Sequence, residues 1–398
     1  MSNENDAKLA RLLLRVGAAP PHIADFHRRQ LISAAARFGM GAAAMAALSA
    51  SFAFPAAAAT AVKLPEMTSI PDSLKGKGSV RVCSYGGAFQ AAQREAYFKP
   101  FEALSGIKVI ESEGPDVAKV KAMVDTHSIE YDIGEFDRGD VINLQRKGDY
   151  WEKIDYSLFD TAHIDTAYRY EYAVDMLPYG EILAYRTDAF NGAKPTGWKD
   201  FWDAQKFPGP RTLISGSGGL VPELEFAAIA AGTPADKVYP INIDAAYASL
   251  AKIKSDVVKW WEAGAIPAQM LNDKEVVMGS AWNGRIAAIQ ANHAPVEIVW
   301  NQGLLKRDAW VILKGAGNKE NAQKFCAFIT LPISQARLSM LIPYGFVNSA
   351  AAQYIPANRL AQLPTAPAIL EQLIIFNSEW WADNRDAVLA KWPAFLLK

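Results

Sequence analysis

The sequence predicts an α/β protein with two domains, each built on a parallel sheet covered by helices. The first observation is an apolar, β-branched segment over Ser79–Tyr85, followed by a Gly86-Gly87 turn, an amphipathic helix and a second apolar segment over Ile107–Ser112. This order is typical of parallel sheets. The second observation is that the alternation begins again after Arg186. The third is size, because 398 residues that are 51% hydrophobic can form two cores.

The rest of the first half continues this alternation of strands and helices. We expect, in chain order, a helix over Val117–Thr126, a strand over Tyr131–Phe136, a short helix over Val141–Lys147 and a strand over Ala173–Tyr185.

The second half is predicted to be richer in helix. Short strands are expected at Thr212–Ile214 and at Val296–Trp300, and the latter is followed by a loop that ends at Asp308. The apolar spacing predicts helices over Trp198–Trp202, Pro222–Ala231, Asp244–Lys254, Ser255–Gly264, Asn318–Thr330, Ile333–Leu341, Ala366–Phe376 and Ser378–Lys391. The paired tryptophans Trp260-Trp261 and Trp380-Trp381 are expected on two of these helices, as packing residues.

The N-terminal residues predict an export signal. Arg28-Arg29 precede a moderately apolar run that is rich in alanine, and small residues at Ala56–Ala59 offer a cleavage site. We therefore expect a Tat-type signal peptide over residues 1–59 and a linker over residues 60–77. The alternative is a membrane anchor, but alanines and glycines make the run only weakly hydrophobic.

Composition excludes several classes of protein. The formal net charge of −1 and the lack of a basic block argue against nucleic-acid binding. The five histidines are scattered and no Cys-x-x-Cys occurs, so we expect no metal site and no cofactor. Cys83 and Cys326 each lie in an apolar run, which favours two buried thiols over a disulfide. No hydrolase or metalloprotease motif is present, although scattered carboxylates leave a glycosidase-type pair as an alternative.

The stretch Gly279–Asp308 holds the clearest binding chemistry. Its residues Trp282-Asn283-Gly284 are predicted to form an exposed corner, with Arg285 directly after it and the carboxylate of Asp308 at the far end. An indole face attracts positive charge, and a carboxylate pairs with an ammonium group. The stretch therefore predicts a site for a small organic cation.

Three other positions are candidates for the same site. Asp137 lies at the C-terminal end of a predicted strand, where open α/β sheets present ligand-binding residues. Glu181 lies within an apolar strand, so it either faces solvent or requires a partner. The Gly86-Gly87 turn either binds a ligand oxygen through backbone N–H groups or is only a tight turn.

Several ordered segments resemble the periplasmic substrate-binding proteins of ABC transporters, and within them the spermidine/putrescine-binding family. The matching segments are GGAFQAAQREAYFKPFE, GWKDFWDAQKFPGPRTL, DKEVVMGSAWNGRIAAI and KGAGNKENAQKFCAFIT. The resemblance implies a type II periplasmic binding protein, in which two α/β lobes joined by a hinge enclose the ligand in a cleft. It implies a first lobe of residues 78–186 plus 309–352 and a second lobe of residues 187–308 plus 353–398.

The resemblance also implies binding residues and a function. Trp282 and Asp308 match the cleft aromatic and acidic residues of the family, and the implied ligand-binding set is Tyr85, Asp137, Tyr179, Glu181, Glu223, Trp282 and Asp308. The implied function is capture of a polyamine-like amine by a monomeric, non-enzymatic periplasmic protein, which delivers it to an inner-membrane ABC permease. The sequence departs from the family at Lys306-Arg307, which replace an aromatic residue. The alternative ligand is a zwitterionic amino acid or opine-like compound, which would also use Arg138 or Arg285.

Overall fold

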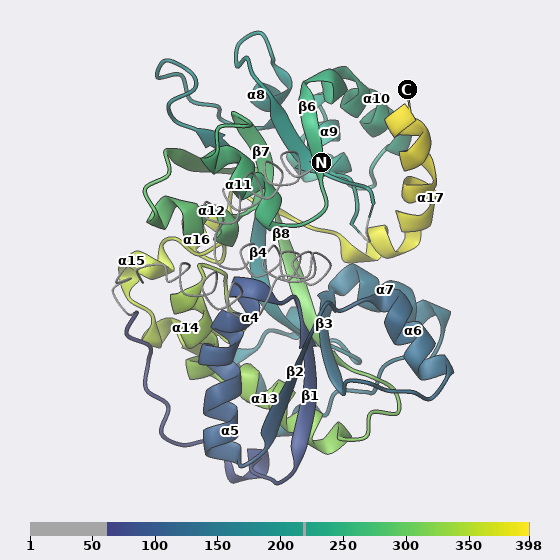
Figure 1. Ribbon diagram of the computed structural model, residues 1–398, viewed down its shortest axis with the longest axis vertical. Helices are drawn as coiled ribbons and strands as arrows, with labels where there is room; N and C mark the ends of the chain where they lie inside the picture. Colours follow the sequence, from purple (N-terminus) through teal and green to yellow (C-terminus); the bar gives the residue numbers. More distant parts are fainter. Residues whose placement is uncertain (1–61, 218–219, 398) are drawn as a thin grey trace, which may run out of the picture. The chain divides into compact units, whose positions relative to one another are not determined.

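The computed structural model describes residues 62–217 and 220–397 (Figure 1). The described strands form one mixed sheet of nine strands, with the order β2-β1-β3-β8-β4-β7-β5-β6 and with β9 beside β8. The strands are β1 Ser79–Ser84, β2 Lys108–Glu113, β3 Ile133–Asp137, β4 Val174–Arg186, β5 Arg211–Ile214, β6 Val257–Trp261, β7 Met278–Trp282, β8 Val296–Ile312 and β9 Ile374–Ile375.

Helices cover the sheet and connect its parallel strands. The predicted helix after Gly86-Gly87 is confirmed as α4 and α5 with one π-helical turn, Arg94–Phe98, between them. The α-helices are α4 Gly87–Gln93, α5 Lys99–Ser105, α6 Val117–Asp125, α7 Arg138–Lys147, α8 Trp198–Trp202, α9 Leu224–Ala230, α10 Ile243–Ile253, α11 Ala265–Asn272, α12 Asn283–Ala291, α13 Lys319–Ile329, α14 Pro332–Leu341, α15 Ala357–Leu360, α16 Pro367–Leu370 and α17 Ser378–Leu397.

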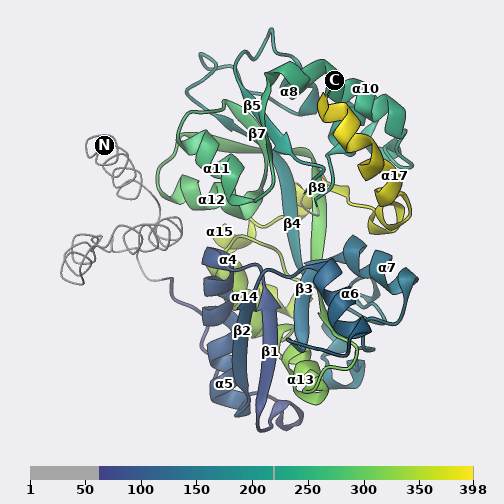
Figure 2. The ribbon, with the colours of Figure 1, turned by 45° about the vertical axis from the view of Figure 1, so that its right-hand side comes forward.

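The sheet has two parallel halves joined by two long antiparallel strands. In the first half β1 pairs in parallel with β2 and β3, and in the second half β5 pairs in parallel with β6 and β7. Strands β4 and β8 pair with each other and run through both halves, as Figure 2 shows. This arrangement confirms the predicted α/β class with two lobes, and it makes β4 and β8 the connection between the lobes.

Each lobe has its own core. One large cluster of buried apolar side chains draws on residues 70–179 and 310–347, and another draws mainly on residues 183–278 and 376–395. Both tryptophans of the 380–381 pair pack in the second cluster. This division runs parallel to the lobe boundaries expected from the sequence, which remain a prediction.

The two lobes also touch away from the crossing strands. Helix α7 of the first lobe packs on the start of α17 of the second, and Arg146 forms ion pairs of 2.5 Å with both Glu379 and Asp383. The lobes are therefore closed against each other on this side of the molecule.

Three sequence predictions are corrected here. Ser255–Gly264 is not a helix, because Val257–Trp261 forms strand β6 at the sheet edge beside β5, with Trp260 and Trp261 on that strand. Ala366–Phe376 is helical only at α16 and then adds β9 to the sheet. The residues after Trp300 are not a loop ending at Asp308, since β8 continues to Ile312 with β3 and β4 on its two sides.

The expectations for the N-terminus and the cysteines have different outcomes. The predicted signal peptide over residues 1–59 lies outside the described residues. In the described part of the predicted linker, Ile70 and Leu74 pack into the core of the first lobe. Cys83 and Cys326 are both buried free thiols, as predicted. None of the helices in the described ranges has both the length and the apolar character that a membrane crossing needs.

Candidate functional site

The sheet register brings most of the predicted binding residues onto one face. Asp308 on β8 lies opposite Asp137 on β3, and Glu181 on β4 lies opposite Trp282 on β7. Tyr179 on β4 lies opposite Lys306 on β8. Directly opposed residues in antiparallel pairs point to the same face, as do residues two apart along one strand. These side chains therefore share one face across four neighbouring strands, and this row is the candidate site.

An unbroken run of aromatic rings crosses the candidate site from one lobe to the other. Successive ring centroids are 5.5–6.4 Å apart, with tilted or edge-on geometry, which is the favoured arrangement for aromatic pairs. Tyr85 is 45% exposed at one end, whereas the rings at the centre of the run are buried. In order, the run consists of Tyr85, Phe89, Tyr344, Tyr179, Trp282 and Trp261.

Three carboxylates gather where β3 meets β8. Asp308 is only 8% exposed, and its carboxylate has no hydrogen bond or ion pair with any described residue. Burial, followed by the charges of Glu135 and Asp137, raises the pKa of Asp308 well above its usual range. Asp137 is already engaged, because its Oδ1 accepts the Gly139 N–H at 2.8 Å as the N-cap of α7. Asp308 is therefore the carboxylate of this group without a protein partner.

Glu135 supports this group from the interior. Its Oε2 accepts hydrogen bonds from Ser84 Oγ at 2.9 Å and from Gln93 Nε2 at 2.8 Å. Burial raises the pKa of Glu135 to about 7. Sequence analysis missed this residue, although an acidic residue inside an apolar strand is the same signal that identified Glu181.

A second charged group lies toward the other lobe. The Lys306 ammonium is 3.3 Å from Glu181 Oε2 and 4.6 Å from the ring centroid of Phe376. Burial alone would lower the pKa of Lys306, but the Glu181, Asp137 and Glu225 carboxylates together raise it. Glu181 therefore has the partner that its position in an apolar strand requires.

Glu223 lies next to Glu181 in the second lobe, at the start of α9. Its Oε2 accepts the Ile214 N–H at 3.1 Å, and its buried Oε1 has no hydrogen-bond partner. Burial and the nearby charge of Glu181 raise the pKa of Glu223 well above its usual range. Glu223 therefore lies within electrostatic range of Glu181, and its membership of the site stays a prediction.

Asn283 and Gly284 are buried and Trp282 is partly buried, which corrects the prediction that the Trp282-Asn283-Gly284 corner is exposed. Asn283 is 1% exposed, because its side chain accepts the Gly180 N–H at 2.9 Å and donates to the Pro343 carbonyl at 2.7 Å. A Cβ on Gly284 would lie 2.7 Å from the ring of Tyr344. The corner therefore packs against the ring of Tyr344 and bonds to the residue before it, which positions Tyr344 in the candidate site. The indole Nε1 of Trp282 is buried without a hydrogen-bond partner.

Arg285 is the cation nearest to this corner. It stands in the first turn of α12, and among the described residues it has no hydrogen bond and no ion pair. Burial raises the pKa of Tyr344 to about 12, the positive charge of Arg285 opposes this rise, and Asp308 adds to it. The hydroxyl of Tyr344 therefore lies within electrostatic range of an unpaired cation and an unpaired carboxylate.

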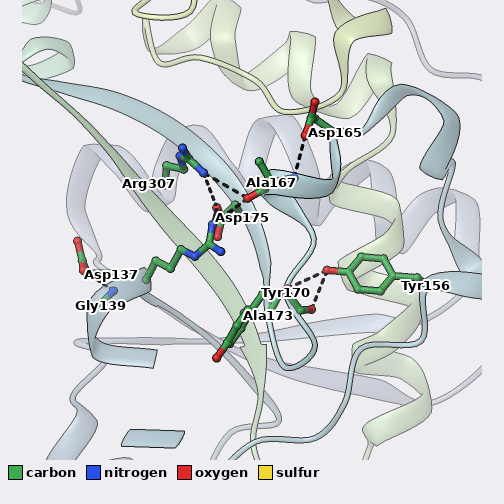
Figure 3. Close-up of polar contacts among 10 residues, drawn as sticks. Asp137, Gly139, Tyr156, Asp165, Ala167, Tyr170, Ala173, Asp175 and Arg307 are labelled. Atoms are coloured by element: carbon green, nitrogen blue, oxygen red, sulfur yellow. Dashed lines mark hydrogen bonds and ion pairs between the residues drawn. The ribbon is translucent and has the colours of Figure 1, made fainter. Parts of the chain in front are cut away.

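Arg138 belongs to a different cluster, around Asp175 and Arg307, two residues that Figure 3 labels. Arg307 directly follows Lys306 on β8 and therefore points to the opposite face of the sheet. Arg138 and Arg307 both bond to Asp175 Oδ2, at 2.7 and 3.4 Å, and both donate to the Ala167 carbonyl. Burial, offset by the two arginines, raises the pKa of Asp175 to about 6. Each arginine is in use within the protein, so this cluster stabilises the fold beside the crossing strands.

The candidate site is largely buried, with Tyr85 exposed at one end. A cavity of about 330 Å³ is lined by Arg138, Arg307 and Phe376, but by none of the seven residues of the ligand-binding set that the family resemblance implies. Within the described ranges, no group of three or more His, Cys, Asp or Glu side chains is arranged to hold a metal ion. Besides Glu135, sequence analysis missed Phe89, Lys306 and Tyr344 as site residues. The Pro343-Tyr344-Gly345 turn offered the same aromatic-on-a-turn signal as Trp282.

Comparison with known proteins gives the family. The model of the bacterial extracellular solute-binding protein family matches residues 96–368. A γ-aminobutyric acid-binding protein from Pseudomonas aeruginosa is 36% identical over 324 residues, 80% of this chain and 90% of that protein. A solved structure of a GABA receptor is 32% identical with a TM-score of 0.73, and the match covers 80% of this chain and 97% of that one. A spermidine/putrescine-binding periplasmic protein from Salmonella typhimurium is 26% identical over 222 residues, 54% of this chain and 60% of that protein.

Proposed function

The chain belongs to the bacterial extracellular solute-binding protein family, and we propose that it binds a small zwitterionic amino acid of the γ-aminobutyric acid class. Members of this family are binding components of transport systems, not enzymes. A γ-aminobutyric acid-binding protein matches 80% of this chain, whereas the spermidine/putrescine-binding protein from Salmonella typhimurium matches 54% of it. Similarity therefore favours the zwitterion over the polyamine expected first from the sequence.

The observation that carries this proposal is the pair of opposite, unpaired charges around Tyr344. Asp308 provides a carboxylate without a protein partner, and Arg285 provides a guanidinium without one. A ligand with an ammonium at one end and a carboxylate at the other satisfies both, with charge-assisted hydrogen bonds at each end. Its methylene groups would lie on the rings of Tyr179 and Trp282.

Binding is coupled to closure of the two lobes. Tyr85 belongs to the predicted first lobe, whereas Trp282 and Arg285 belong to the predicted second lobe, in which Asp308 is the boundary residue. A ligand that contacts both sides binds the closed state more tightly than the open state, and this difference in affinity shifts the population toward closure. The closed form is the one that a transporter would recognise.

The same proposal includes the route of the protein. Residues 1–59 act as a Tat-type leader that is removed on export to the periplasm. The mature protein works there as a monomer and delivers its ligand to an inner-membrane ABC permease. Cell fractionation tests export to the periplasm, the N-terminal sequence of the exported protein tests removal of the leader, and co-purification tests binding to a permease. None of these measurements depends on the identity of the ligand.

The test is isothermal titration calorimetry with a set of four-carbon ligands that differ in their charged ends, and with two larger ligands for comparison. The exported protein is titrated with 4-aminobutyrate, butylamine, butyrate, putrescine and spermidine, and an opine is included as a larger zwitterion. We expect 4-aminobutyrate to bind most tightly, because it alone of the four-carbon set satisfies both unpaired charges. Tighter binding of putrescine or spermidine would overturn the proposal.

The variant Arg285→Gln sharpens this test. It should weaken 4-aminobutyrate binding by about 1–3 kcal/mol, because one charge-assisted contact is lost, and it should leave butylamine affinity unchanged. The matched control is Arg94→Gln, whose guanidinium pairs with Glu111 in the first lobe at the sheet edge. Equal loss for 4-aminobutyrate and butylamine would remove Arg285 from the carboxylate-binding role.

A further inference from the structure

We infer that the side-chain ammonium of Lys306 makes the site select a ligand with one amine over a diamine. It already occupies the place that the second amine of a diamine would take. This inference rests on the proposed function and adds to it the residue that decides between zwitterion and diamine.

The surroundings of Lys306 are those of a bound organic cation. The residue is 7% exposed, its ammonium is 3.3 Å from a Glu181 carboxylate oxygen, and it lies 4.6 Å from the ring centroid of Phe376. A carboxylate on one side and an aromatic face on the other are the contacts that a ligand ammonium takes in a protein site. The protein thus supplies an ammonium from one of its own side chains.

The register places this ammonium inside the candidate site. Lys306 lies opposite Tyr179, and it is two residues from Asp308 on the same strand, so all three side chains share one face. Arg307, between them in sequence, is on the other face, where it meets Asp175. Lys306 is therefore on the face of the candidate site and not part of the Asp175 cluster on the other face.

The charge balance then favours a ligand with a single amine. Asp308 is the carboxylate left without a partner, while Glu181 is neutralised by Lys306. One ligand ammonium pairs with Asp308, but a second ammonium in the direction of Glu181 would meet Lys306. Like charges that approach in a site of low dielectric repel strongly. In the proposed binding mode the ligand carboxylate pairs with Arg285, so it meets no repulsion from Lys306.

A purely structural role for the Lys306–Glu181 pair makes a different prediction. Buried ion pairs can serve only to neutralise each other, and removing one partner then costs stability without any change in ligand preference. If Lys306 instead stands in for an amine, its removal exposes Glu181 to the ligand. The preference should then move toward diamines, and this gain should depend on Glu181.

The experiment measures Kd for 4-aminobutyrate and for putrescine, which has the same number of carbons, by calorimetry on the full exported protein. The variants are Lys306→Met, Lys306→Gln and the double variant Lys306→Met with Glu181→Gln. Lys194→Met is the matched control, because Lys194 also pairs with a glutamate, Glu297, but at an exposed position. Melting curves verify that each variant is folded.

We expect the affinity ratio of putrescine to 4-aminobutyrate to rise about tenfold or more in Lys306→Met. The ratio should return to the wild-type value in the double variant and stay unchanged in Lys194→Met. An unchanged ratio in folded Lys306→Met overturns the inference. If Lys306→Met does not fold, Lys306→Gln makes the same comparison with a polar side chain in place. If the wild-type protein does not bind 4-aminobutyrate, the proposed function is refuted. If the wild-type protein binds it but Lys306→Met leaves the affinity ratio of putrescine to 4-aminobutyrate unchanged, only the role of Lys306 is refuted.

Discussion

Asp175 and Asp308 are two buried carboxylates on the strands that join the lobes, and they differ in what surrounds them. Asp175 on β4 is held between Arg138 and Arg307, with ion pairs of 2.7 and 3.4 Å. Asp308 on β8 is buried among other carboxylates and has no hydrogen-bond partner among the described residues. A buried charge is costly unless it is paired. The paired carboxylate stabilises the fold, and in the proposed function the unpaired one binds a ligand that brings the missing positive charge.

The strongest test of this comparison is to remove the negative charge from each of the two carboxylates in turn. The variant Asp175→Asn should lower the free energy of unfolding by about 2–4 kcal/mol, because two largely buried guanidinium groups lose their counter-ion. Urea denaturation followed by circular dichroism measures the change. Ligand affinity of the remaining folded protein should stay within a factor of about two, since the cluster lies on the other face of β8.

The variant Asp308→Asn should give the reverse pattern. Ligand affinity should fall by about 2–3 kcal/mol, because the ligand ammonium loses its ionised partner. The free energy of unfolding should stay the same or rise, since a buried charge close to Glu135 and Asp137 is removed. Calorimetry with 4-aminobutyrate and urea denaturation of the same sample measure both. A loss of stability as large as that of Asp175→Asn would cancel the distinction between the two carboxylates.

The smallest expected effect concerns pH. The pKa of Glu135 is raised to about 7 and that of Asp175 to about 6, both above the values of an unfolded chain. The folded protein therefore takes up protons first as the pH falls, and its free energy of unfolding should rise by on the order of 1 kcal/mol between pH 8 and pH 6. Melting temperatures without ligand should follow this rise. With Asp175→Asn the part of the rise near pH 6 should disappear, while the part near pH 7 should remain.

Sequence reasoning predicted the class of the fold because its local signals agree. The strand–glycine–helix–strand order after Ser79 appears as β1, α4, α5 and β2, with the expected parallel pairing. The failures lie where pairing between distant segments decided the outcome. Val257–Trp261 is a strand because β5 offers it an edge, and the residues after Trp300 are a strand because β3 and β4 lie on both sides.

The candidate site shows the same division. Glu181 was predicted from a charge placed within an apolar strand. Trp282 and Asp308 were predicted from an aromatic corner and a carboxylate at the two ends of one stretch, and from the family resemblance. Nothing near Glu135 or Lys306 in the chain indicates their neighbours, because Ser84, Gln93 and Glu181 are 42 to 125 residues away. The roles of Arg138 and Arg285 could be separated only by their partners in space.

The sequence by itself determined the two α/β lobes, the buried thiols and the chemical types of residue available to a ligand, since these depend on composition and on short-range periodicity. Only the tertiary structure decided which charges are neutralised and which are left open. Charge pairing depends on distances across β3, β4 and β8, and the register of those strands sets these distances. That register joins segments more than a hundred residues apart, so the polarity of the ligand site is a property of the folded sheet.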